Sequence, residues 1–66
     1  MNEASMLIEA LLYTLQTYER IVGHVTVFVC SREIYELLDE PEFVLGKSVE
    51  IDDELYGYTS NAWRWL

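Results

Sequence analysis

The sequence predicts a single small α+β domain over residues 1–66, in which a long N-terminal helix packs on a sheet of two to three strands beside a short second helix. Two patterns in the first half predict this fold. Apolar residues recur at helical spacing from residue 3 to about 21, and an unbroken run of strand-forming residues follows at 25–30. A third pattern, a serine-capped helical segment before an alternating stretch at 48–52, adds the second helix and another strand.

The long helix is predicted by apolar residues whose spacing alternates between four and three, which places them on one face of a helix. Glu3 suits the positive end of the helix dipole, Asn2 precedes it as a candidate N-cap, and Gly23 ends the helix. The stripe consists of Ala4, Ile8, Leu11, Leu15, Tyr18 and Val22, widened by Leu7 and Leu12. We expect this stripe to contact the sheet.

A second, weaker apolar patch lies on the opposite side of the predicted helix. Met6, Ala10, Tyr13 and Thr17 fall within about one sixth of the helical circumference. This patch is either a partly exposed flank of a small protein or a contact between the helices of two copies. The second interpretation predicts a homodimer, and self-association would also stabilise so short a chain.

Residues 25–30 predict a central strand, because neither of its faces is polar. Val25, Val27 and Val29 point to one side, and Thr26, Phe28 and Cys30 point to the other. We therefore expect cover on both sides, from the helices of the chain or from a second copy. Cys30 is the only cysteine, so it cannot form an intramolecular disulfide, and we expect a buried thiol in a reduced, cytoplasmic protein.

The middle of the chain predicts a helix and a strand. Ser31 caps a predicted helix over residues 32–40, which Pro41 stops. Apolar and acidic residues then alternate over residues 48–52, as in a strand with one buried face. This strand either follows a tight parallel crossover or pairs antiparallel through a longer path.

Four aromatic residues mark the tail that follows residue 55: Tyr56, Tyr58, Trp63 and Trp65. The two tryptophans would share one face of a short terminal strand, with Ala62, Arg64 and Leu66 on the other. Tyrosine and tryptophan are common anchors of protein interfaces, because they offer large contact area at low entropy cost. These rings therefore either bind a partner or complete the core.

Acidic residues dominate the charge of the chain, which is −8 at pH 7. Between residues 33 and 54, nine acids stand against a single base, Lys47, so this window holds the whole net charge. Such a surface disfavours direct binding of nucleic acid or an anionic membrane and favours a basic protein partner. The candidate acidic face consists of Glu33, Glu36, Asp39, Glu40, Glu42, Glu50, Asp52, Asp53 and Glu54. It either imitates the phosphates of a duplex or only keeps the protein in solution.

No pattern predicts an enzyme, a metal site or a cofactor. His24, the one histidine, lies at a helix-to-strand corner without a nucleophile or carboxylate pattern beside it. Asp52, Asp53 and Glu54 are adjacent, whereas a calcium loop alternates its ligands and needs a glycine at its sixth position. Glu9 interrupts the apolar run of the first helix, so we expect neither a signal peptide nor a membrane span.

In size, charge and style the chain resembles the small orphan proteins of bacteriophages and other mobile elements, among them anti-CRISPR proteins and inhibitors of host enzymes. In addition, residues 25–55 are similar to a strand–helix–strand segment of tailed-phage major capsid proteins. The matching features are the strand VTVFV, Ser31, Ile34-Tyr35, Leu37-Leu38, Leu45-Gly46 and VEIDDEL. That family has proline where this chain has Ser48, and a capsid subunit is several times longer. The resemblance implies a phage origin rather than a role in building a shell, and it carries over no functional residue.

Together these patterns predict a non-enzymatic inhibitor of a nucleic-acid-binding host or defence protein, located in the host cytoplasm if the chain is phage-encoded. Its acidic face would imitate nucleic acid, and the aromatic tail or the helix would add an apolar anchor. The alternative is a structural or assembly module that forms a homo-oligomer through its long helix and central strand. Neither hypothesis calls for a cofactor.

Overall fold

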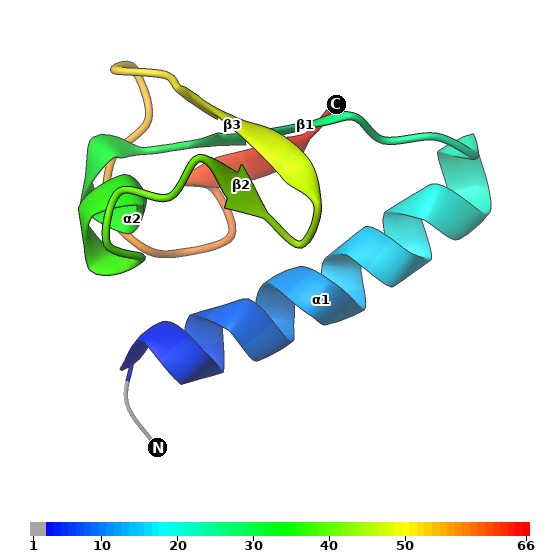
Figure 1. The fold of residues 1–66 in the computed structure, drawn as a ribbon, viewed down its shortest axis with the longest axis horizontal. Helices are drawn as coiled ribbons and strands as arrows, with labels where there is room; N and C mark the ends of the chain where they lie inside the picture. Colours follow the sequence, from blue (N-terminus) through cyan, green and yellow to red (C-terminus); the bar gives the residue numbers. More distant parts are fainter. Residues whose placement is uncertain (1–2) are drawn as a thin grey trace.

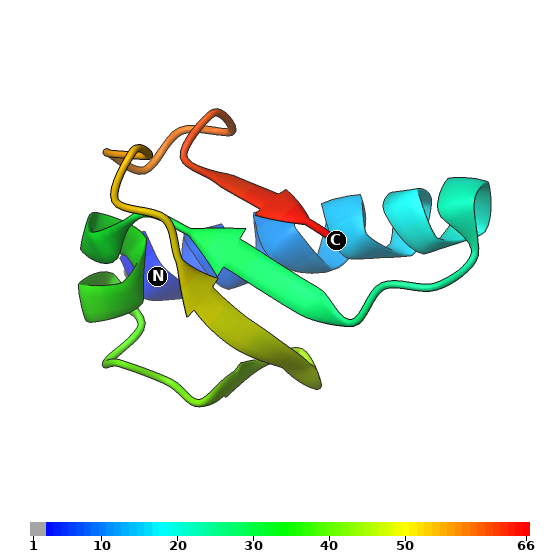
Figure 2. The same ribbon diagram turned by 90° about the horizontal axis from the view of Figure 1, so that it is seen from above.

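The structure, a computed structural model, describes residues 3–66 and has two layers (Figure 1). Helix α1 (Glu3–Val22) forms one layer, and a four-stranded sheet forms the other. Helix α2 (Arg32–Leu37) lies at one end of the sheet, beside the N-terminal half of α1, as Figure 2 shows. The predicted α+β class, with a long first helix and a short second one, is confirmed. The candidate N-cap Asn2 lies outside the described residues.

The sheet contains four strands, where the sequence predicted two to three, and their order is β2-β3-β1-β4. They are β1 (Val27–Cys30), β2 (Phe43–Val44), β3 (Lys47–Ile51) and β4 (Trp63–Trp65). β1 pairs parallel with β3 and antiparallel with β4. The chain therefore crosses over through α2 between two parallel strands, which decides between the two paths that the sequence left open. The first strand, predicted from residue 25, begins at Val27.

β2 escaped prediction because it is very short and ends in an unusual turn. Leu45 and Gly46 both have positive φ angles, 51° and 82°, and form a two-residue hairpin turn to β3. Such turns usually carry asparagine or aspartate before glycine, so leucine gives no turn signal. The Leu45 side chain instead packs partly buried against the core. Packing, rather than turn propensity, accounts for the residue at this position.

The two faces of β1 are covered in different ways. Phe28 and Cys30 face α1 in the core, whereas Val29 faces the other side of the sheet and is still only 2% exposed. No helix of residues 3–66 lies on that side (Figure 1). Instead Arg64 on β4 pairs with Asp52 at the end of β3, at 3.0 Å between Nη2 and Oδ2, so their side chains span β1. Within the single chain, the Arg64–Asp52 pair therefore covers this side in place of a helix.

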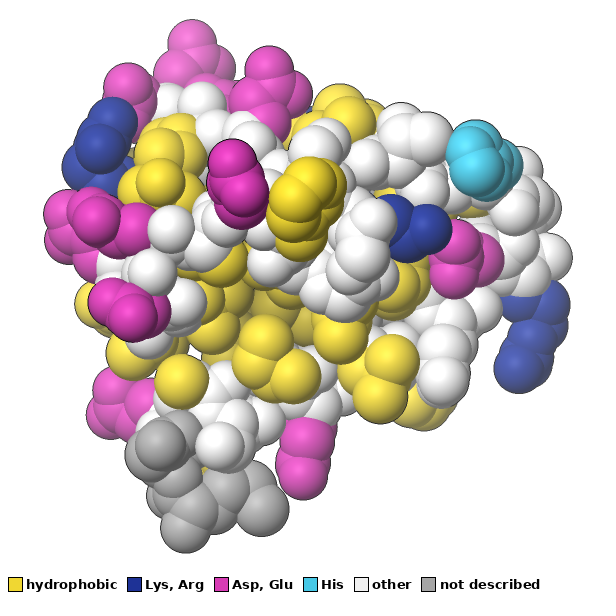
Figure 3. All heavy atoms as spheres, in the orientation of Figure 1, with side chains coloured by type: hydrophobic (Ala, Val, Ile, Leu, Met, Phe, Trp, Pro, Cys, Tyr) yellow, Lys and Arg dark blue, Asp and Glu magenta, His cyan; other side chains and the backbone are white. Residues whose placement is uncertain are grey.

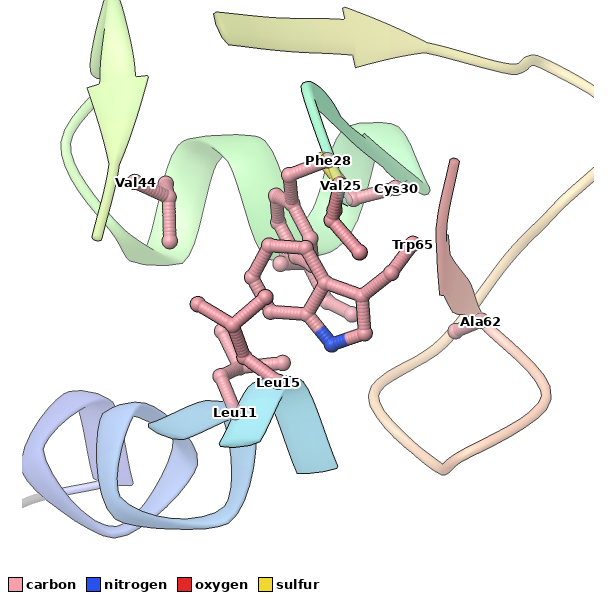
Figure 4. Packing of buried hydrophobic residues seen from close by; sticks show 9 residues of the cluster. Leu11, Leu15, Val25, Phe28, Cys30, Val44, Ala62 and Trp65 are labelled. Atoms are coloured by element: carbon pink, nitrogen blue, oxygen red, sulfur yellow. The ribbon is translucent and has the colours of Figure 1, made fainter. Parts of the chain in front are cut away.

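The core lies between α1 and the sheet around two tilted aromatic rings (Figure 4). The ring centroids of Phe28 and Trp65 are 4.7 Å apart, and the Trp65 indole N–H donates to Thr14 Oγ1 at 3.2 Å. A buried indole needs such a partner, because an unpaired N–H is costly away from water. The core cluster consists of Leu11, Leu15, Val25, Phe28, Cys30, Ile34, Val44, Ala62 and Trp65.

Only the middle of the predicted helical stripe is buried. Leu11 and Leu15 lie in the core. Leu12, Tyr18 and Val22 are exposed. The C-terminal turns of α1 run past the edge of the sheet, so the last residues of the stripe have no layer to contact (Figure 1). The spacing predicted the correct face of the helix but not the length over which that face is covered.

The prediction for the terminal strand was wrong in one detail, the position of Ala62. Trp63 and Trp65 do share a face, but Ala62 is fully buried in the same cluster as Trp65 rather than on the opposite side. β4 begins one residue later, so Ala62 belongs to the turn before it, where its N–H donates to Thr59 O at 2.8 Å. The alternation of strand side chains does not extend into that turn.

α2 ends three residues earlier than predicted, at a Schellman-type C-cap. The Asp39 N–H donates to Glu36 O at 3.0 Å, and the Glu40 N–H donates to Tyr35 O at 2.9 Å. Asp39 and Glu40 both have positive φ angles, 66° and 51°, a region that glycine adopts more readily. The cap therefore holds two acidic residues in fixed positions on the surface.

Ser31, fully buried, joins three parts of the chain. Its Oγ accepts a hydrogen bond from the Ile34 N–H at 3.1 Å, which confirms the predicted N-cap of α2. The same hydroxyl donates to Gly57 O at 2.8 Å, and the Ser31 backbone N–H donates to Ala62 O at 2.8 Å. One residue thus fixes the start of α2 and the loop that leads to β4.

Replacing Ser31 with alanine should lower the free energy of unfolding by about 2 kcal/mol, because the Ile34 N–H and the Gly57 carbonyl both lose their partner. Urea denaturation measures the change. Ser60→Ala, in the exposed turn before β4, is the matched control and should change the free energy by less than about 0.5 kcal/mol. Equal losses in the two variants would contradict the role given to Ser31.

Candidate functional site

Acidic residues from two separate segments lie together at the end of the molecule that α2 forms. Two contacts join the segments: Arg32 Nη2 lies 3.4 Å from Asp53 Oδ1, and the Gly57 N–H donates to Glu33 Oε1 at 3.3 Å. Figure 3 shows acidic side chains gathered at this end and the single histidine at the opposite end. We call this surface the acidic end, made of Glu33, Glu36, Asp39, Glu40, Asp52, Asp53 and Glu54.

Two residues of the predicted acidic face lie along the sheet instead. Glu42 leads into β2, where its carbonyl accepts a hydrogen bond from the Val49 N–H at 3.3 Å. Glu50 lies on β3 opposite Val29, on the open side of the sheet. The structure therefore brings most of the predicted face together at α2 and leaves these two carboxylates beside it.

Few bases neutralise the acidic end. Arginines pair with two carboxylates of the loop after β3: Arg32 with Asp53, and Arg64 with Asp52. Lys47, the one base in the acidic window, pairs with Glu19 of α1, at 3.0 Å between Nζ and Oε2. The other carboxylates of the window form no ion pair within residues 3–66: Glu33, Glu36, Asp39, Glu40, Glu42, Glu50 and Glu54. The surface around α2 therefore stays strongly negative.

The carboxylate of Asp52 is held in its charged form. The Glu54 N–H donates to its Oδ1 at 2.9 Å, and the Arg64 guanidinium donates to its Oδ2 at 3.0 Å. The first contact, followed by the second, lowers the pKa of Asp52 below its ordinary value of 3.8. These contacts also fix the turn that carries Asp53 and Glu54.

The aromatic tail divides between the core and the surface. Trp65 is buried and Trp63 is partly buried against the core, so the folded chain does not present Trp65 to a partner. Tyr56 and Tyr58 are exposed. Tyr58 also lines a shallow hollow with Met6 and other residues of α1 and α2. Only part of the predicted aromatic set is therefore available for binding.

The second apolar patch of α1 is exposed, with Met6 59% and Tyr13 70% accessible. Ala10, between these two residues, and Thr17, one turn after Tyr13, are also exposed. The Thr17 hydroxyl donates a hydrogen bond to Tyr13 O at 3.1 Å. Ile21, four residues after Thr17, continues the patch and was missed, although its helical spacing was a usable signal. We call these residues the α1 strip: Met6, Ala10, Tyr13, Thr17 and Ile21.

A groove that the sequence did not predict lies between the first half of α1 and the chain from the end of α2 to the β2–β3 turn. It is open to solvent and has a volume of about 630 Å³. Ile8 comes from α1, and Phe43 and Leu45 come from the other wall. Because these residues are far apart in the sequence, only the folded chain brings them together.

The one cysteine of the chain, Cys30, is buried. Burial raises the pKa of the Cys30 thiol to about 11, so it stays protonated near neutral pH. His24 is exposed. Within residues 3–66, no group of three histidine, cysteine or acidic side chains is placed to hold a metal ion. No helix in the same range is long and apolar enough to cross a membrane.

No family model, no curated protein and no solved structure matches this chain.

Arg64→Gln should raise the pKa of the Asp52 carboxyl, because it removes one of the two contacts that lower it. The shift should be incomplete, since the stronger contact with the Glu54 N–H remains. NMR titration of the side-chain carboxyls measures it. The stabilising effect of this charged form is present above the ordinary pKa and is lost as the pH falls. Arg32→Gln is the control: it removes the ion pair with Asp53 and should leave the pKa of Asp52 unchanged.

Proposed function

We propose that this chain is a non-enzymatic binding protein whose acidic end occupies the nucleic-acid site of a basic protein and so inhibits it. The observation that carries the proposal is the joint position of α2 and the loop after β3. Their carboxylates lie at one end of the molecule with few arginines to neutralise them. A concentrated negative field speeds encounter with a basic surface and favours it over other partners.

The rigid attachment of these charges supports mimicry of nucleic acid. Asp39 and Glu40 are fixed by the C-cap of α2, and Asp52 is fixed by its two hydrogen bonds. Ser31 and the Glu33 contact tie the helix to the loop. Charges on such a frame lose less conformational freedom on binding than charges on mobile chains, which favours affinity.

The partner class follows from the charge and from the resemblance to mobile-element proteins. A host or defence protein that binds DNA or RNA presents a basic groove, which is the complement of the acidic end. The chain itself would not bind nucleic acid, because its acidic surface repels phosphates.

Removing two charges from the acidic end should weaken capture of the basic partner about tenfold at low salt, because the negative field that attracts a basic surface is reduced. The variant is Glu36→Gln with Glu40→Gln, both exposed and outside the ion pairs. Gln16→Lys with His24→Lys changes the net charge equally at exposed positions outside the acidic end and outside the ion pairs, and is the matched control. The measurement is capture from host lysate over a salt series, followed by competition between this chain and duplex DNA or RNA for the captured protein.

Capture of a nucleic-acid-binding protein that high salt releases, and that the control variant still binds, is the expected result. Recovery of no basic partner would contradict the proposal. So would equal capture by the two variants, because the position of the charges would then be irrelevant.

A second candidate function is assembly into a homo-oligomer, and the α1 strip favours it. Met6 and Tyr13 expose apolar surface that a neighbouring helix could cover. Sedimentation equilibrium at micromolar concentration should then detect a dimer, and Ala10→Glu, in the middle of the strip, should dissociate it. Gln16→Glu, on the polar side of the same helix, should not. A strict monomer would remove this candidate.

A further inference from the structure

We propose that the groove between α1 and the β2–β3 turn holds a basic amphipathic helix of the partner protein. The apolar stripe of that helix would enter the groove, while its lysines and arginines would face the acidic residues around it. This inference rests on the proposed function, because it names the part of the basic partner that the chain binds.

The groove offers apolar surface that the fold itself does not cover. Ile8 and Leu45 are partly buried on its two walls, and Val44 lies beneath them in the core. Phe43 lies at its margin and is 62% exposed, which is high for a large apolar side chain on an edge strand. A helix seated here would cover these groups in the way that amphipathic helices fill apolar grooves.

The margin of the groove is acidic. Glu9 of α1 and Asp39 after α2 line it from two sides, and both are exposed. Glu40 and Glu42, both exposed, flank Pro41, which also lines the groove, and add negative charge next to it. An apolar floor with carboxylates at its margin is complementary to a helix that carries lysines or arginines beside its apolar stripe.

Charge also argues against other occupants. Nucleic acid would bring phosphates against carboxylates. A second copy of the chain would bring a further net charge of −8 to an acidic margin. The groove is open and about 630 Å³ in volume, and its lining is mainly apolar rather than a set of converging polar groups that would orient a small molecule. The basic amphipathic helix is the occupant that satisfies both the floor and the margin.

Synthetic peptides of about 18 residues test the proposal, a length that permits helix formation. One peptide carries leucines at helical spacing and lysines elsewhere. A second has the same composition in scrambled order, and a third replaces the lysines with glutamates. Fluorescence anisotropy measures affinity, and NMR chemical shifts of the labelled chain locate the contact. The striped lysine peptide should bind at least about tenfold more tightly than either control, with the shift changes centred on Ile8, Phe43 and Leu45.

Phe43→Ser should weaken binding of the striped peptide about tenfold. Tyr13→Ser removes a similarly exposed aromatic ring from the α1 strip and should leave the affinity unchanged. If the striped and scrambled peptides bind equally, and Glu36→Gln with Glu40→Gln weakens both, the groove is not the binding site. The inference is then overturned and the proposed function stands. Failure of both lysine peptides to bind at low salt would overturn the groove and the electrostatic basis of the proposed function together. A Phe43→Ser variant that changes sedimentation but not peptide binding would assign the groove to a second copy and overturn the inference.

Discussion

The buried hydroxyl of Ser31 is the contact on which the arrangement of the molecule depends. It accepts from the first turn of α2 and donates to Gly57 O, so the helix and the long loop after β3 are fixed to one another. With that loop in place, β4 pairs with β1 and Trp65 completes the core against Phe28. The same contact brings the two acidic segments together, because one lies on α2 and the other on the loop. The core and the candidate binding surface therefore share one constraint.

Prediction of the fold succeeded where a pattern extends over many residues. It failed where only a few residues determine the local structure. The buried face of α1 and the inner strand follow from helical spacing and from the apolar run around Phe28. The length of the buried stripe could not be predicted, since it depends on where the sheet ends beneath α1. β2 could not be predicted either, because it has two residues and its turn begins with Leu45 at a positive φ angle. In both cases tertiary contacts outweigh the local signal.

The acidic end was predictable in composition but not in shape. The concentration of charge between residues 33 and 54 is visible in the sequence, and most of those side chains do lie together. Their internal pairs are not visible, because Arg64 meets Asp52, and Arg32 meets Asp53, only through the sheet and the loop after β3. The groove was not predictable at all, since its walls come from opposite ends of the first 45 residues.

The position of the charge also decides which surfaces two copies can share. Repulsion between the acidic ends of two copies acts over about 10 Å at moderate salt. It therefore opposes contact between copies at the acidic end and at the groove beside it. The α1 strip is different, because it lies on the side of α1 away from the core and has few charged neighbours. These are Glu3, which lines the same hollow as Met6 and Ala10, together with Glu9 and Arg20. Contact between copies is therefore least opposed at the α1 strip, while a basic partner is favoured at the groove. The two surfaces are separate, so self-association and partner binding need not compete, and a dimer could present two acidic ends to one basic target.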